Sequence, residues 1–303
     1  MKSGFIIVNK PKGITSHDVV QRIRNILGIK KVGHAGTLDP FATGVLIIGV
    51  NKATRLLEFF QNERKTYYVK GQLGIITETF DIEGEIKERN SVDKIDIENL
   101  RNVLLSFIGE YLQVPPAYSA KKYKGRKLYE YAREGKIINL PPKKVTIYNI
   151  INFSQIGTEF AFQVDVSSGT YIRSLIMDIG YKLGCGAVTK ELVRLKSGKY
   201  SLKDAVELNE VSKDKIIDMD KALDLPYVQV NNGEKVLQGQ QIFKENIMEY
   251  STFDKGDYVK IYDESMDFLG IGLSERKSDF LNTLIEKIPE RNERIVKIHK
   301  ILI

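Results

Sequence analysis

The segment of residues 33–46, GHAGTLDPFATGVL, constrains the fold more than any other part of the chain. It places the carboxylate of Asp39 among three glycines, a histidine and a proline. Glycine permits close backbone approach and positive φ, and helical geometry is disfavoured before proline, so the segment predicts a shaped loop that presents Asp39. The same residues also fit a helix that starts with Asp39 as its N-cap and Pro40 as its first residue. Asp39 is a candidate catalytic residue, and its local structure stays open between these two.

The charge of the chain is unevenly distributed. Lysine and arginine number 46 against 39 for aspartate and glutamate, a formal net charge of +7. Residues 223–303 hold 11 basic and 14 acidic side chains, or −3, which leaves 35 minus 25, or +10, for residues 1–222. We therefore expect a polyanionic partner to bind mainly the first part of the chain.

Residues 113–144 are the most basic stretch of that first part. They contain nine lysines and arginines against Glu130 and Glu134, with four tyrosines interleaved. Basic side chains can follow RNA phosphates while tyrosines stack on bases, so this pattern predicts an RNA clamp. The alternative is a solvated helix face, because residues 127–134 are compatible with a helix.

Several classes of protein are disfavoured. A single cysteine excludes an intramolecular disulfide and a multi-cysteine zinc site, and three scattered histidines have no metal-ligand spacing. The first residues hold only a short apolar run, so we expect no signal peptide, no membrane-spanning helix and a cytoplasmic location. No convincing glycine-rich nucleotide-binding motif follows a predicted strand, so no cofactor is expected.

Hydrophobic periodicity predicts a mixture of helices and strands. A helix is expected between Thr15 and Gly28, because a capping-box-like start precedes apolar residues at helical spacing. Further helices are expected at residues 95–108 and 171–183, and strands at residues 67–73, 144–153 and 159–166. From residue 227 the apolar segments become short and are separated by turn sequences, a pattern typical of small β-barrels.

Four strings in a fixed order carry a resemblance to a known family. They are NKPKG at residues 9–13, the segment at residues 33–46, KTY at residues 65–67 and SSGTYIRSL at residues 167–175. Together they resemble the TruB-type bacterial tRNA pseudouridine synthases over about residues 4–200. The tail after Leu225 resembles, more weakly, the RNA-binding PUA domain that follows in that family.

The resemblance implies a fold and a function. The expected fold is α+β: a pseudouridine synthase catalytic domain over residues 1–222, with a mixed, largely antiparallel sheet and the basic insertion near 113–144, then a small PUA-like β-barrel domain over 223–303. The expected reaction is the conversion of uridine 55 in the T loop of tRNA to pseudouridine by base flipping. We expect a monomer that binds the tRNA T arm and needs no cofactor, metal, membrane or guide RNA.

The resemblance also suggests roles for single residues. Asp39 would attack the sugar or remove a sugar proton, Arg173 would keep that carboxylate charged, and Tyr67 would stack on the base and handle the C5 proton. A structural ion pair or phosphate contact stays open for Arg173, and ordinary packing for Tyr67, whose neighbour Tyr68 faces the other way. The expected substrate-binding residues are His34 in the space of the flipped base, Tyr171 and Leu192 in the uracil pocket, Lys10 and Lys12 in the NKPKG turn, and Lys121, Lys122 and Arg126 in the basic segment. Ordinary core packing stays open for Leu192, and a hydrogen bond within the loop for His34. Lys10 and Lys12 could either support the catalytic loop or contact a backbone phosphate.

Alternatives to a guide-free pseudouridine synthase also stay open. A guide-dependent relative is disfavoured because the chain has no long extra basic tails. A non-catalytic RNA-binding or RNA-folding protein would gain nothing from a carboxylate such as Asp39 beside RNA phosphates. Another RNA-modifying chemistry, such as methyl transfer, lacks a recognisable cofactor motif.

Overall fold

The computed structural model describes residues 2–92, 96–119, 121–138 and 140–302. The chain divides into two compact units, residues 1–216 and 217–303, whereas the expected boundary follows residue 222. Residue 95 of the expected second helix, and residues 120 and 139 of the basic segment, lie outside the described residues.

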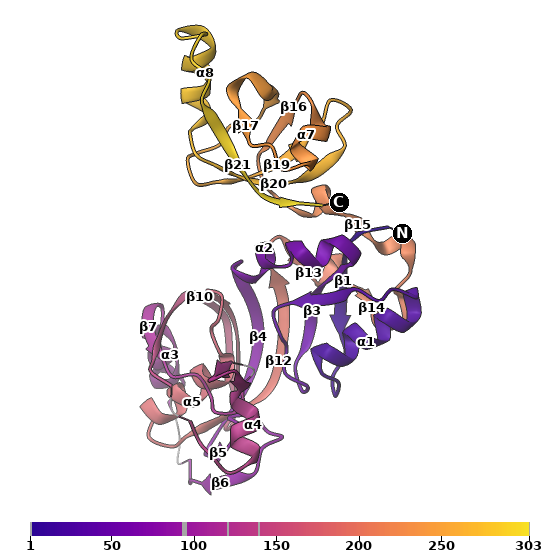
Figure 1. Ribbon diagram of the computed structural model, residues 1–303. Coiled ribbons are helices and arrows are strands. Elements are labelled where there is room, and N and C mark those ends of the chain that lie inside the picture. The colour runs from indigo at the N-terminus through magenta and orange to yellow at the C-terminus, as the bar shows by residue number, and fades with distance from the viewer. Residues whose placement is uncertain (1, 93–95, 120, 139, 303) are drawn as a thin grey trace. The chain divides into compact units, whose positions relative to one another are not determined.

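A mixed β-sheet forms the larger unit (Figure 1). Its strands follow the order β14 (Val206–Glu207), β1 (Gly4–Lys10), β3 (Thr43–Val50), β12 (Ala187–Ser197), β4 (Lys65–Leu73), β11 (Glu159–Val166), β10 (Lys143–Ile156) and β7 (Gly109–Gln113). Strand β2 (Val32–Ala35) pairs with β3, and β13 (Tyr200–Ser201) pairs with β12. Only the β1–β14 and β3–β12 pairs on this path are parallel, which confirms the predicted mixed, largely antiparallel sheet.

Helix α1 (Ser16–Leu27) covers one part of this sheet. Thr15 caps it, with reciprocal hydrogen bonds to Asp18, and Gly28 ends it with φ of 66°. Its apolar stripe packs on β1 and β3 in one hydrophobic cluster. The predicted first helix is confirmed, because the capping residues and the apolar spacing both act locally.

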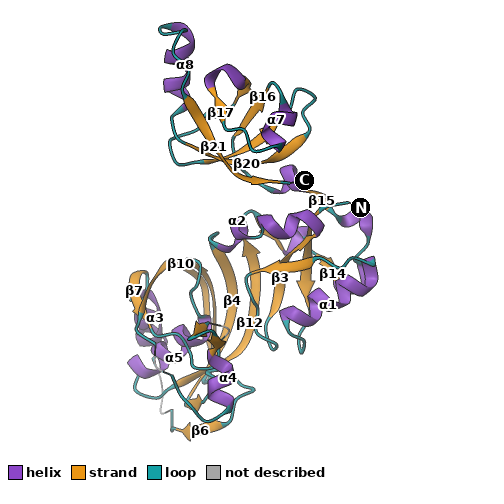
Figure 2. Cartoon of the chain, in the orientation of Figure 1, coloured by secondary structure: helices purple, strands orange, loops and turns teal. Residues whose placement is uncertain are grey.

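A second hydrophobic cluster joins two helices to the other end of the sheet. Helix α3 (Ile97–Leu105) and helix α5 (Ile172–Lys182) pack with the apolar faces of β4, β10 and β11. Figure 2 shows these purple helices beside the orange strands. The remaining regular segments of this unit are η1 (Asn51–Leu56), α2 (Glu58–Gln61), α4 (Leu128–Arg133), β5 (Ile75–Thr77), β6 (Ile86–Arg89), β8 (Lys122–Tyr123), β9 (Arg126–Lys127), η2 (Leu202–Asp204), η3 (Leu208–Glu210) and η4 (Lys213–Lys215).

The segment around Asp39 is a loop between β2 and β3. The amide of Ala42 donates to the Asp39 carbonyl at 3.1 Å, and the chain then enters β3 at Thr43. The alternative of a helix that starts at Asp39 is therefore wrong, because this strand pairs with β1 and β2 and holds the chain extended. Gly44 has φ of 107°, and a Cβ there would lie 2.3 Å from the Arg194 carbonyl oxygen. Glycine is needed where β3 meets β12.

The smaller unit contains the predicted small barrel. Its strands follow the order β17 (Ile242–Phe243), β21 (Arg294–Ile301), β20 (Phe268–Ser274), β19 (Tyr258–Tyr262), β16 (Tyr227–Val230) and β18 (Ile247–Tyr250), a nearly closed barrel around one apolar cluster. Its other segments are β15 (Ile217–Asp218), α6 (Met219–Ala222), α7 (Gly233–Leu237), η5 (Lys244–Asn246) and α8 (Ser278–Glu286). Within the described ranges of the whole chain, no helix is long and apolar enough to cross a membrane.

Candidate active site

Asp39 and Arg173 form an ion pair. Arg173 Nε lies 2.9 Å from Asp39 Oδ2, and Arg173 Nη2 donates to Asp39 Oδ1 at 3.1 Å. The Arg173 side chain is only 4% exposed, whereas the Asp39 carboxylate is 34% exposed. A buried guanidinium therefore supplies a permanent positive charge to a carboxylate that faces an opening.

Further contacts fix the Arg173 guanidinium. Its Nη1 donates to the Thr79 carbonyl at 2.6 Å and to Asp81 Oδ2 at 3.3 Å, and its Nη2 donates to the Tyr118 carbonyl at 2.8 Å. Asp81 is itself buried, and burial raises the pKa of its carboxyl, while the charge of Arg173 opposes that shift. Arg173 thus connects two carboxylates, of which only Asp39 faces solvent appreciably.

The loop that carries Asp39 is held in place by side chains of Ser16 and Lys10. Ser16 Oγ accepts from the Leu38 amide at 2.9 Å and donates to the Leu38 carbonyl at 3.1 Å. Lys10 is fully buried, and its ammonium donates to the carbonyls of Pro11, Ile14 and Pro40. Burial lowers the pKa of Lys10 to about 8. These contacts favour loop support over phosphate contact for Lys10.

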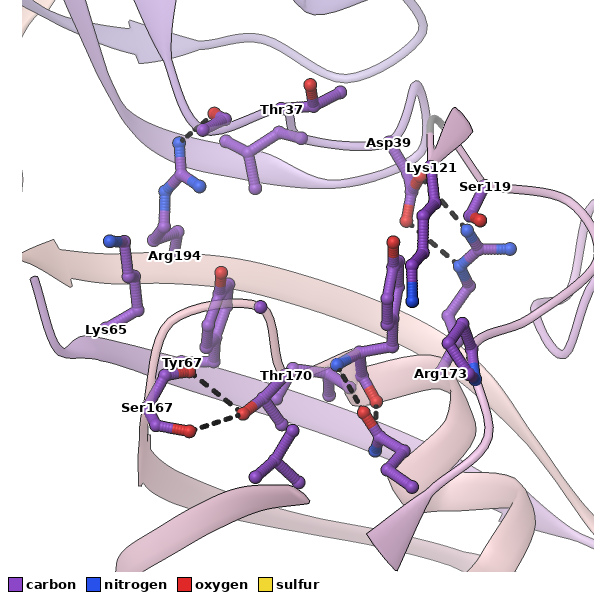
Figure 3. Close-up of a pocket in the computed structure, with 18 of the residues that line it drawn as sticks. Thr37, Asp39, Lys65, Tyr67, Ser119, Lys121, Ser167, Thr170, Arg173 and Arg194 are labelled. Carbon is purple, nitrogen blue, oxygen red and sulfur yellow. Dashed lines mark hydrogen bonds and ion pairs between the residues drawn. The ribbon is translucent and has the colours of Figure 1, made fainter. Parts of the chain in front are cut away.

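A pocket of about 450 Å³ opens beside this ion pair (Figure 3). Six of the candidate residues predicted from the sequence line it: Asp39, Tyr67, Lys121, Tyr171, Arg173 and Leu192. Along β4 the side chains alternate between buried and half-buried, so Tyr67 faces the pocket and Tyr68 faces away, as the spacing predicted. Leu192 belongs both to the pocket lining and to the hydrophobic core, so its two interpretations coincide.

Gln113 holds the start of α5 at this pocket. Its side-chain amide donates to the Tyr171 carbonyl at 2.9 Å and accepts from the Tyr171 amide at 2.7 Å. Burial raises the pKa of the Tyr171 hydroxyl. Gln113 could not be identified from the sequence, because its partner is 58 residues away and no local pattern connects the two.

A second pocket, of about 690 Å³, shares Asp39 and Arg173 with the first. His34 lines it from β2, together with residues of the basic segment such as Lys127 and Tyr129. Burial lowers the pKa of His34 and so favours the neutral imidazole, which suits a ring that packs against a base. The Asp39–Arg173 pair therefore stands between two cavities.

Other residues of the candidate set lie outside both pockets. Lys12 is exposed in its turn, and Lys122 is exposed in the hairpin of β8 and β9. Arg126 is already paired, because it contacts Glu134, lies 3.7 Å from Glu130 and stacks on a tyrosine ring. Of the basic segment's predicted contacts, Lys121 alone lines the first pocket.

Two cations at the first pocket were given no role by the sequence analysis. Arg194 donates from Nε to the Val45 carbonyl at 2.7 Å and from Nη2 to the Gly36 carbonyl at 3.0 Å. Lys65 is buried at the start of β4. Lys65 stands in the KTY string, so the motif could have drawn attention to it, but Arg194 has no comparable signal. Among the described residues no group of three histidine, cysteine, aspartate or glutamate side chains is placed to hold a metal ion.

Comparison with known proteins connects this site to one family. The sequence matches the TruB family pseudouridylate synthase N-terminal domain over residues 24–172 and two TruB C-terminal domains over residues 173–225 and 227–279. It is 50% identical to tRNA pseudouridine synthase B of Thermotoga maritima over 99% of both chains. It is 42% identical to the protein of that name from Aquifex aeolicus, over 89% of this chain and 94% of that one.

Two solved structures share the fold along nearly the whole chain. One is an H/ACA RNP bound to a substrate RNA containing 2′-deoxyuridine, with a TM-score of 0.74 and 26% identity. The other is a Cbf5-Nop10-Gar1 complex, with a TM-score of 0.73 and 28% identity. In both cases the match covers 99% of this chain and 85% of the other chain.

Proposed function

The chain belongs to the TruB family of pseudouridylate synthases, enzymes that isomerise uridine in tRNA, and we propose that it acts on the T-loop uridine at position 55 with Asp39 as its catalytic group. One observation carries this proposal: the Asp39–Arg173 ion pair stands in the wall shared by two pockets. A carboxylate in that place can meet the sugar of a nucleotide whose base enters the first pocket.

The reaction breaks the bond between N1 and C1′ and joins C5 to C1′. Asp39 starts it, either by attack on C1′ or by removal of the C2′ proton, and Arg173 keeps the carboxylate aimed. The base lies on Tyr67, between Tyr171 and Leu192. Tyr67 takes part in the final transfer of the C5 proton.

The target uridine must leave the base stack before it can reach this pocket, at a cost of a few kcal/mol. His34 lines the adjacent second pocket, where its neutral ring takes the place that the base vacates. Basic and aromatic side chains of residues 113–144 hold the RNA next to both pockets. Each of these contacts is part of the proposal.

We also propose that the enzyme acts as a monomer and without a guide RNA. The relatives that match 99% of both chains at 50% identity bear the name tRNA pseudouridine synthase B. The solved ribonucleoprotein relatives match at 26% and 28% identity. The closer similarity supports direct recognition of the tRNA T arm.

The test is to incubate the purified chain with an unmodified tRNA transcript, without added cofactor or guide RNA, and to map pseudouridine along the RNA. We expect modification at the T-loop uridine alone. A product at another uridine would refute the proposed site, and RNA binding without any product would favour the alternative of a non-catalytic RNA-binding protein.

A further inference from the structure

Two positively charged side chains are buried at the end of the first pocket that lies away from Asp39. Arg194 is 1% exposed and Lys65 is 6% exposed, and both line the pocket. They come from the neighbouring strands β12 and β4. Figure 3 shows them on one side of Tyr67, with Asp39 and Arg173 on the other side.

Within the described part of the chain, these cations donate their hydrogen bonds to neutral groups. Neither forms an ion pair with a carboxylate among the residues that the structure describes, and their donors go to backbone carbonyls of Phe60, Gln61 and Glu63 for Lys65 and of Val45 and Gly36 for Arg194. Burial, together with the charge of Arg194, lowers the pKa of Lys65 to about 8, and the charge of Glu63 acts in the opposite direction. Two buried like charges without a carboxylate in direct contact are costly, so their place calls for a functional reason.

The reaction itself produces a negative charge in this pocket, an argument that rests on the proposed function. When the bond between C1′ and N1 breaks, its electron pair goes to the uracil and spreads over N1, O2 and O4. The sugar either forms an ester with Asp39 or loses its C2′ proton to Asp39 and becomes a glycal. By both routes one negative charge leaves Asp39, beside Arg173, and appears on the detached base.

We propose that Lys65 and Arg194 stabilise this detached uracil anion until C5 joins C1′. The attraction between these two cations and the base is strongest once the negative charge develops on the base, so Lys65 and Arg194 stabilise the transition state of bond cleavage more than the bound substrate. When C5 attacks C1′, the charge returns to Asp39, as the ester is displaced or as the C2′ proton is given back. At an effective dielectric constant of about 20, a unit charge about 7 Å from the base changes the cleavage rate by about 50-fold.

The experiment compares substrates that differ in the leaving base. Transcripts carry uridine or 5-fluorouridine at the target position, and loss of the intact nucleotide is followed at saturating enzyme. Fluorine withdraws electrons, so the fluorinated base leaves more readily and needs less help. The variants are Lys65→Met and Arg194→Gln, with Lys196→Gln, an exposed lysine on the same strand as Arg194, as the matched control.

We expect each pocket variant to lose about 50-fold in rate with uridine and several-fold less with 5-fluorouridine, while affinity for tRNA stays within about twofold. Lys196→Gln should match the unsubstituted enzyme on both substrates. Equal losses on the two substrates, or no loss, would overturn the proposal and leave a structural role.

Thermal unfolding of each variant separates folding from chemistry. If Lys65→Met or Arg194→Gln does not fold, Arg194→Lys decides: it keeps the charge but alters the bonds to Val45 and Gly36, and it should retain the normal ratio between the two substrates. A shifted ratio in Arg194→Lys would contradict the proposal. Failure of the proposed function looks different, because the unsubstituted enzyme would then leave both target nucleotides intact.

Discussion

Replacing Arg173 by lysine tests how the Asp39 carboxylate is held. Arginine makes two contacts with Asp39, at 2.9 and 3.1 Å, and also reaches Asp81 and the carbonyls of Thr79 and Tyr118. A lysine ammonium is a single point with three donors on a shorter arm, so it cannot serve both carboxylates and both carbonyls. The positive charge remains, but the geometry is lost.

The magnitude follows from what is left without a partner. Each carbonyl that loses its donor costs about 1–3 kcal/mol, so loss of both the Thr79 and Tyr118 contacts should lower the free energy of unfolding of Arg173→Lys by about 2–6 kcal/mol. Asp81 loses its close contact with the guanidinium, whose charge opposes the upward shift of its pKa, so its carboxyl moves further toward the neutral form. Misplacement of Asp39 by this change should cost about 2–4 kcal/mol of transition-state stabilisation, or a rate loss of about 30- to 1000-fold.

The assay is single-turnover release of tritium from C5-labelled uridine in tRNA at saturating enzyme, with affinity measured in parallel. Arg173 is buried and the net charge is unchanged, so affinity should stay within about twofold. Arg101→Lys, on the exposed side of α3, is the matched control and should behave as the unsubstituted enzyme. A rate within threefold of normal in a folded Arg173→Lys variant would refute the reasoning.

Three further predictions concern Tyr67, the basic segment and Lys65. Tyr67→Leu should remove nearly all activity, and Tyr67→Phe should bind tRNA but stall at the final proton step. Tyr68→Leu, on the other face of β4, should lower activity less. A greater loss of activity in Tyr68→Leu would assign the pocket-facing role to Tyr68. Neutralising Lys121, Lys122 and Lys124 of the basic segment together should flatten the log–log salt dependence of tRNA affinity by about two to three units. Arg126→Gln alone should change this slope less, because Glu134 already pairs with Arg126. An unchanged slope in the triple variant would place the RNA-binding surface elsewhere. Burial lowers the pKa of Lys65 from 10.5 to about 8, so the unfolded chain binds more protons between these two values. The contribution of Lys65 to the free energy of unfolding should therefore rise with pH across that window. Denaturant titrations of the unsubstituted enzyme and of Lys65→Met should show this difference, and an identical pH dependence of the two would contradict it.

Local signals explain why much of the fold could be predicted. The capping residues of α1, the alternation along β4 and the apolar stripe of α5 all act within a few residues, and each element lies close to its predicted range. The helix start at Asp39 was the wrong alternative because pairing of β3 with β1 and β2 overrides the local preference of an Asp-Pro pair. The mixed, largely antiparallel sheet came only with the family resemblance, and the order of its strands was not predicted, since pairing between distant strands has no local pattern.

The residues of the candidate site likewise divide into those that a sequence motif identifies and those that only the folded structure reveals. Asp39, Tyr67 and Arg173 stand in recognisable strings and line one pocket. Gln113 and Asp81 act through partners 58 and 92 residues away, so only the folded chain brings them to the site. Lys10 stands in a recognisable string too, yet its burial beneath the loop could not be read from its polar side chain.

The most direct measurement compares Asp39→Asn with the unsubstituted enzyme for both tRNA affinity and single-turnover pseudouridine formation at the T loop. Asparagine keeps the size of the side chain and can still face Arg173, but it offers neither a nucleophilic carboxylate nor a base. We predict no detectable product and an affinity equal to or above that of the unsubstituted enzyme, because a negative charge near RNA phosphates has been removed. Turnover above trace levels in Asp39→Asn would contradict the central claim and assign the chemistry to another residue.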